Sequence, residues 1–164
     1  MKSRNAINRL AFLFVVILMA SGLSSCSEKE SPEDQVRQFV AAAVTAAESR
    51  EALAIRKLIS DKYMDESRRD RRALTALAMG YFLRHKNIHL FTQISEIKIP
   101  TQNQAGVKLY AAMAGRPVTG AQALIDIRAD IYQFDLTLER DGEDWLLHKL
   151  HWNRVNIEDI VGGE

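Results

Sequence analysis

Cysteine is nearly absent from this sequence, which has one Cys in 164 residues. A single thiol excludes an internal disulfide framework and any metal site built from several thiolates. An excess of one charge is also missing, because 22 Lys+Arg face 21 Asp+Glu and the formal net charge is +1. Nucleic-acid-binding domains carry a clear basic excess or stripe, so we expect no nucleic-acid partner. The 47% hydrophobic content is that of an ordinary globular domain.

A hydrophobic run long enough to cross a membrane does not occur near the amino terminus. The apolar run Leu10–Ala20 has eleven residues, whereas a helix needs about 20 to cross the bilayer core of about 30 Å. Lys2, Arg4 and Arg9 precede this run without any acid, and small residues follow it. A basic start, a short apolar run and small residues are typical of a secretory signal peptide.

The segment Leu23-Ser24-Ser25-Cys26 follows this run. It resembles the bacterial lipobox, in which a branched apolar residue and two small residues precede a Cys. The resemblance implies that the Cys26 thiol receives a diacylglycerol, that the chain is cut before Cys26, and that the new amino terminus receives a fatty acid such as palmitate. Two or more acyl chains anchor stably, since each buried CH₂ contributes about 0.8 kcal/mol. The alternative is an ordinary signal peptide followed by an incidental Cys.

The sequence around the lipobox also predicts the domain organisation. We expect a cleaved signal peptide at residues 1–25, the lipidated Cys and a short tether at 26–32, a folded domain at 33–156 and a tail at 157–164. Loss of residues 1–25 leaves 19 Lys+Arg against 21 acids, so the mature chain is slightly acidic. Position 27 is Ser and not the Asp that retains Gram-negative lipoproteins in the inner membrane, so the resemblance implies an outer-membrane protein facing the periplasm in such a host.

Three amphipathic helices are predicted in the first half of the domain. The first begins at Ser31-Pro32, with Ser31 as the N-cap and acids in its first turn. The second is shorter and begins at Ser49, and the third begins after Asp65-Glu66 and ends at residues 84–87. Each has apolar residues at the spacing of one helix face, which we expect to face the core: Val36, Phe39, Val40, Ala43 and Ala47; Ile55, Leu58, Ile59 and Tyr63; and Leu74, Leu77, Ala78, Tyr81 and Phe82.

From residue 88 onward the apolar period changes to two, which predicts strands. The expected strands lie at 88–99, 105–114, 123–140 and 143–155, and Asp141-Gly142 between the last two is a tight-hairpin signal. Helices followed by hairpins predict an α+β fold with a four-stranded antiparallel sheet.

The alternation changes phase inside three of these strands. The changes fall after Ile94, between Ile131 and Tyr132, and between Leu147 and Leu150. A slip of one residue moves every later side chain to the other face, so each change requires a bulge or a sharp bend if the core face is to stay apolar. We therefore predict a strongly curved sheet that wraps around the helices.

Three helices followed by four bent strands resemble the NTF2-like superfamily, which is also described as SnoaL-like or cystatin-like. The final Asp141-Gly142 hairpin with Trp145 and Trp152 is familiar from small members of that superfamily, and the resemblance covers residues 33–155. It implies a cone with a pocket between the helices and the concave sheet face. Its members include isomerases, cyclases, dehydratases, transport factors and binding proteins, so the fold alone does not specify a function.

Four residues are our candidates for lining such a pocket or contacting a ligand: Tyr81, His89, Tyr132 and Trp152. A second hypothesis is an enzyme of the SnoaL or isomerase kind, in which a pocket Asp acts as the base and a Tyr stabilises an oxyanion. Candidate donors are Tyr81, Tyr110 and Tyr132. The acids would come from the alternating Asp126, Arg128 and Asp130, although a solvated strand face with paired charges explains that pattern more simply.

The remaining polar clusters predict no chemistry. His85, His89, His148 and His151 lack the spacing of metal ligands, so we expect neither a metal nor another cofactor. The charged stretch 65–72 has acids that neutralise its cations at helical spacing, which predicts a solvated helix start.

The preferred hypothesis is an envelope lipoprotein, anchored through Cys26, whose domain binds a small apolar ligand or a protein partner without catalysis. The enzyme remains one alternative. A homodimeric envelope-assembly module, with the outer sheet face as its interface, is the other.

Overall fold

The computed structural model describes residues 30–115, 117 and 130–156. Every described helix and strand belongs to the compact unit Ser31–Glu164. The signal segment, Cys26 and residues 157–164 lie outside the described residues, and so do Asp126, Arg128 and the side chain of Asp130. Within the described ranges, none of the helices has the length and apolar character needed to cross a membrane.

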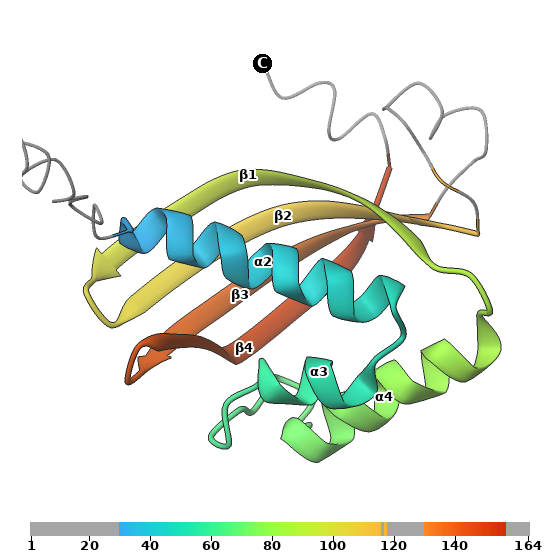
Figure 1. Cartoon of the computed structure of the whole chain (residues 1–164), viewed down its shortest axis with the longest axis horizontal. Coiled ribbons are helices and arrows are strands. Elements are labelled where there is room, and N and C mark those ends of the chain that lie inside the picture. The colour runs from blue at the N-terminus through green and yellow to red at the C-terminus, as the bar shows by residue number, and fades with distance from the viewer. Residues whose placement is uncertain (1–29, 116, 118–129, 157–164) are drawn as a thin grey trace, which may run out of the picture. The chain divides into compact units, whose positions relative to one another are not determined.

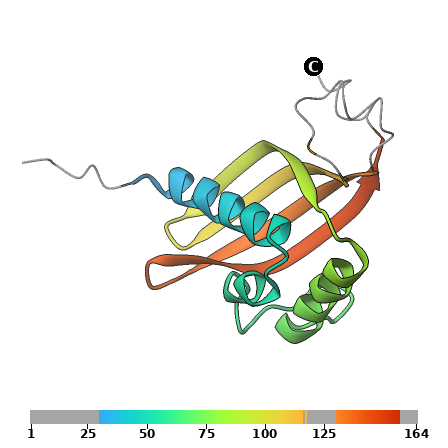
Figure 2. The same cartoon turned by 45° about the vertical axis from the view of Figure 1, so that its right-hand side comes forward.

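Helices come first and strands second, as the sequence pattern predicts. The helices are α2 (Pro32–Glu48), α3 (Ala52–Lys57) and α4 (Arg71–Arg84), and the strands are β1 (His89–Thr101), β2 (Gln104–Ala114), β3 (Asp130–Asp141) and β4 (Asp144–Val155). The strands form one antiparallel sheet in the order β1-β2-β3-β4. In Figures 1 and 2, α2 crosses one face of this sheet and the α3–α4 pair lies on the same side. The α+β prediction with a four-stranded antiparallel sheet is confirmed.

Helix α2 begins where its capping signals place it. The Ser31 hydroxyl accepts a hydrogen bond from the Asp34 backbone N–H at 3.1 Å, and Pro32 occupies the first turn. Such a cap satisfies one of the donors that every helix leaves free at its amino terminus. Val36, Phe39 and Val40 are buried, so the predicted apolar stripe faces inward.

The second helix is shorter than predicted. It begins at Ala52, without a side-chain cap, and ends at Lys57. Beyond this end the backbone pairs with β4: the Leu147 N–H donates to the Leu58 carbonyl at 2.8 Å, and the Ser60 N–H donates to the Leu147 carbonyl at 2.9 Å. This pairing with a distant strand satisfies the backbone groups that a longer helix would use, so the prediction of a helix extending to Tyr63 is wrong.

The third helix starts later than predicted. Its N-cap is Asp70, whose carboxylate accepts a hydrogen bond from the Ala73 N–H at 2.8 Å, and not a residue near Asp65. Asp65 lies in the preceding loop and is buried. The prediction of a solvated helix start at 65 is therefore wrong.

Two of the three predicted interruptions in the strands are present. The β1–β2 register shifts between Ile94 and Glu96, and the β3–β4 register shifts where Lys149 pairs with Thr137 and Leu147 with Leu138. Each shift inserts an extra residue, Ser95 in β1 and His148 in β4, which increases the local bend.

The third predicted interruption, between Ile131 and Tyr132, is absent. Pairing between β2 and β3 runs without a break from Gln104–Glu139 to Met113–Asp130. Ile131 and Tyr132 occupy opposite faces of a regular strand, and Ile131 is buried on the face that does not line the cavity. The phase change here reflects apolar residues on both faces and not a bulge.

The core of this unit is formed by α2, the segment after α3, Leu74 of α4 and the sheet. Its buried cluster consists of Val36, Phe39, Val40, Ile59, Tyr63, Leu74, Ala105, Val107, Leu109, Ala111, Leu138, Trp145 and Leu147. All of these residues lie between positions 36 and 147, within the unit Ser31–Glu164.

Candidate functional site

A cavity of about 520 Å³ lies between the helices and the sheet. This volume falls within the range of about 300–1,000 Å³ found for small-molecule sites. Most of its lining is apolar and comes from all three helices and all four strands. The lining residues are Phe39, Val40, Ala43, Val44, Ala47, Ile55, Leu58, Ile59, Arg69, Leu74, Leu77, Ala78, Tyr81, Phe82, Arg84, Ile88, Leu90, Thr92, Leu109, Ala111, Met113, Tyr132, Phe134, Leu136, Leu147, Leu150 and Trp152.

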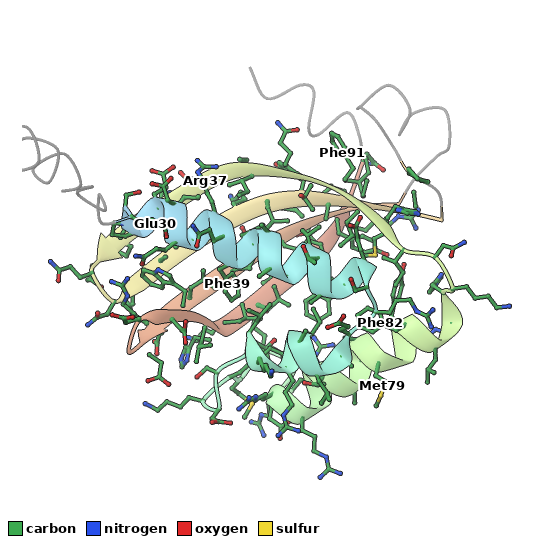
Figure 3. All side chains as sticks on the ribbon, in the orientation of Figure 1. Glu30, Arg37, Phe39, Met79, Phe82 and Phe91 are labelled. Atoms are coloured by element: carbon green, nitrogen blue, oxygen red, sulfur yellow. The ribbon has the colours of Figure 1, made fainter. Side chains whose placement is uncertain are left out.

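The apolar stripe of α4 lines this cavity, and Leu74 of the stripe also belongs to the buried cluster. Leu74 and Phe82 are buried, but Leu77 is 45% exposed although it also lines the cavity. Figure 3 shows Phe39 of α2 and Phe82 of α4 on the inner side of their helices, while Met79 points away from the sheet. Hydrophobic spacing identifies the inward face of a helix, but it does not distinguish a packed core from the wall of a cavity.

Three of the four candidate pocket residues are brought together here. Tyr81 from α4, Tyr132 from β3 and Trp152 from β4 all line the cavity. His89 begins β1, is half-buried and is not among the lining residues. Tyr81 stacks on His85, with 4.1 Å between the ring centroids.

Arg69 is one of the two cations in the described lining, and no sequence motif singles it out. Arg69 belongs to the loop before α4, and its side chain is one-third exposed. Its Nε donates to Asp65 Oδ2 at 2.6 Å, and its backbone N–H donates to Asp65 Oδ1 at 2.9 Å. The Asp65 side chain is only 1% exposed. The buried Asp65 carboxylate thus holds both the backbone and the side chain of Arg69 in place.

Tyr63 completes this cluster from the buried side. Its hydroxyl donates to Asp65 Oδ2 at 3.3 Å, and the residue is 1% exposed. Burial and the adjacent Asp65 carboxylate raise the pKa of Tyr63 above its ordinary value. Burial acts to raise the pKa of Asp65 as well, but the hydrogen bonds and charge of Arg69 outweigh it and hold that pKa below its usual value. Asp65 is therefore ionised at neutral pH and Tyr63 is neutral.

The guanidinium of Arg69 also contacts the aromatic wall of the cavity. Its Cζ atom lies 4.5 Å from the ring centroid of Trp152. A cation held over an indole face is stabilised by the ring quadrupole, so Asp65 and Trp152 together hold this cation in place. The only sequence signal for the arrangement is the i, i+4 spacing of Asp65 and Arg69, which we interpreted as a solvated helical pair.

The described lining residues include no Asp, Glu or His, and Tyr110 is not among them. The acid that pairs with Arg69, Asp65, has a lowered pKa and accepts hydrogen bonds from Tyr63 and twice from Arg69. A general base that works near neutral pH needs a raised carboxylate pKa.

Two histidines of the described residues each lie beside a glutamate. His148 Nδ1 is 3.4 Å from Glu139, and His151 Nδ1 is 3.4 Å from Glu66. No group of three or more metal-ligating side chains occurs within residues 30–115 and 130–156.

Comparison with known proteins identifies the fold. No family model matches the sequence, and no curated protein matches it. Among solved structures, a protein assigned as a scytalone dehydratase from Novosphingobium aromaticivorans superimposes with a TM-score of 0.62 at 10% identity, covering 76% of this chain and 84% of the other. A Nostoc punctiforme domain of unknown function with a cystatin-like fold gives 0.59 at 14% identity, covering 82% and 84%.

A third neighbour carries the superfamily name. An NTF-2 like protein of unknown function from Shewanella oneidensis gives a TM-score of 0.56 at 15% identity, covering 74% of this chain and 98% of the other. The similarity to Bd1075 of Bdellovibrio bacteriovorus, in contrast, covers 75% of this chain but only 40% of that protein. Identities this low show a shared fold and no more. The chain has the NTF2-like, cystatin-like fold that its element order resembles.

Proposed function

We propose that this protein is a lipid-anchored envelope protein whose NTF2-like domain binds a small, largely apolar ligand without catalysis. The observation that carries the binding proposal is the cavity of about 520 Å³ with its apolar lining. Apolar surface that remains uncovered costs free energy in water, and a concave apolar site with few polar groups is the usual form of a small-molecule site.

The enzymatic alternative has weaker support. Structural neighbours include a protein assigned as a scytalone dehydratase and a ketosteroid isomerase-like protein, but the fold hosts binding proteins as well as enzymes. The described lining residues include tyrosines but no Asp, Glu or His. Catalysis would need an acid or base in addition to the described lining residues, whereas binding an apolar ligand needs only the apolar lining itself.

Filling the cavity tests the binding proposal. Ala43 and Ala42 are neighbours on α2, but Ala43 lines the cavity whereas Ala42 is exposed to solvent. We expect Ala43→Trp to weaken binding of the neutral apolar probe N-phenyl-1-naphthylamine about tenfold or more, because the indole occupies ligand volume. Ala42→Trp is the matched control and should bind the probe like the wild type. Equal probe binding by the two variants, or no binding by the wild type, contradicts the proposal.

The anchor is tested at Cys26. The proposal rests on the lipobox-like Leu23-Ser24-Ser25-Cys26 behind a short apolar run. We expect mass spectrometry of the mature protein to show a diacylglyceryl group and an acylated amino terminus on Cys26, and Cys26→Ser to release the protein from the membrane fraction. An unmodified amino terminus contradicts lipid anchoring without affecting the binding proposal. Homodimer formation and a protein partner remain predictions, which native mass spectrometry of the soluble domain tests.

A further inference from the structure

Arg69 has the position and the contacts expected of a side chain that binds a polar group of a ligand. It lines an otherwise apolar cavity, its Nε is bound to the buried Asp65, and its guanidinium lies over Trp152. A side chain held at two points loses little conformational entropy when it binds a ligand. Among the described residues, none of the hydrogen bonds of Arg69 uses its two terminal amino groups.

The charged side chains in the described part of the cavity wall have one sign. The described lining residues include two cations, Arg69 and Arg84, and no acid. Asp65 balances part of the Arg69 charge. Its buried carboxylate contacts the Nε of Arg69, and Asp65 is not a lining residue. The terminal amino groups remain available as a planar pair of donors, a geometry that matches the two oxygens of a carboxylate.

We propose that the ligand is an amphiphile with one apolar chain and a terminal carboxylate, and that Arg69 binds the carboxylate while the cavity holds the chain. This inference rests on the proposed function, because it names the ligand class of the same cavity. The apolar lining accounts for the chain, and Arg69 accounts for the carboxylate. Trp152 supports the guanidinium and covers the start of the chain.

The experiment compares two ligands that differ only in the headgroup. Dodecanoate and dodecanol are titrated, below the concentrations at which they aggregate, against residues 27–164, which contain the whole of the described core. Displacement of N-phenyl-1-naphthylamine reports binding. We expect dodecanoate to bind about tenfold or more tightly than dodecanol, because hydrogen bonds to charged groups are the stronger ones.

The variants locate the headgroup. We expect Arg69→Gln to reduce the affinity for dodecanoate to about that for dodecanol in the same variant, so that the preference for the carboxylate is lost. Arg68→Gln is the matched control, because Arg68 is the preceding residue, is exposed and does not line the cavity. Since Arg69→Gln leaves the Asp65 carboxylate buried without its cation, the double variant Asp65→Asn/Arg69→Gln is measured beside it.

The outcomes separate the two proposals. Binding of both ligands with equal affinity overturns the carboxylate inference and leaves apolar binding intact. Failure of both to bind overturns the proposed function and the inference with it. A preference for dodecanoate that persists without Arg69 but is lost in Arg84→Gln overturns the assignment to Arg69.

Discussion

Arg69 and Trp152 form a cation–π pair, with the Cζ atom of Arg69 4.5 Å from the centroid of the indole ring. The pair joins the loop before α4 to the last strand of the sheet. It therefore links the cavity wall to the segment that carries the buried Asp65.

Replacing the indole should weaken this link. We expect Trp152→Leu to lower the free energy of unfolding by about 2 kcal/mol, through lost cation–π attraction and lost apolar contact. Trp152→Phe keeps an aromatic face for the guanidinium and should lose less. Urea unfolding measures both. Equal losses in the two variants contradict a role for the cation–π contact.

Asp65 should contribute more to stability than any exposed acid of the domain. We expect Asp65→Asn to lower the free energy of unfolding by about 3 kcal/mol, because breaking a buried ion pair leaves Arg69 uncompensated. Asp61, which pairs with Arg71 but is 89% exposed, is the control, and Asp61→Asn should cost less than about 1 kcal/mol. Similar losses in the two variants contradict the special role of Asp65.

This contribution depends on pH in a defined direction. The folded-state pKa of Asp65 is lowered, so its stabilisation is complete above the unfolded-state pKa of about 3.9. It is lost as the pH falls through the lower folded-state pKa. Urea unfolding at several pH values should therefore show the difference between wild type and Asp65→Asn disappearing in acid. A difference that persists at the lowest pH contradicts this mechanism.

Tyr63 should limit stability at the alkaline end. Its folded-state pKa is raised, first by burial and then by the Asp65 carboxylate, so the phenol is more stable as the neutral form in the folded protein. That contribution is complete below the unfolded-state pKa of about 10 and is lost as the pH rises through the folded-state pKa. Unfolding of Tyr63→Phe should show a smaller loss of stability above about pH 10. An equal loss of stability in the wild type and in Tyr63→Phe would exclude Tyr63 as the cause of the alkaline loss.

Parts of this fold could be read from short stretches of sequence. Ser31 caps α2 where its pattern indicates, and Gly142, with φ of 65°, begins the two-residue turn Gly142-Glu143 of the hairpin that Asp141-Gly142 predicts. Two phase changes in the apolar alternation correspond to the bulges at Ser95 and His148. These features depend on residues close together in the chain, so sequence pattern is sufficient for them.

Other features depend on partners far along the chain. Pairing of Leu58 and Ser60 with Leu147 ends α3 early, and no local signal reveals it. The burial of Asp65 is equally hidden, because an acid and an arginine at i, i+4 look alike on a solvated helix and in a buried loop.

The cavity, too, has one aspect that local sequence predicts and one that depends on distant contacts. Spacing places Leu77, Ala78 and Tyr81 on the inner face of a helix, and periodicity alone predicts that much. Whether that face meets packed side chains or an open volume depends on how far the bent sheet stands from the helices. Contacts such as those of β4 with α2, and of Trp152 in β4 with Arg69, join segments far apart in the sequence, and only the folded chain brings them together.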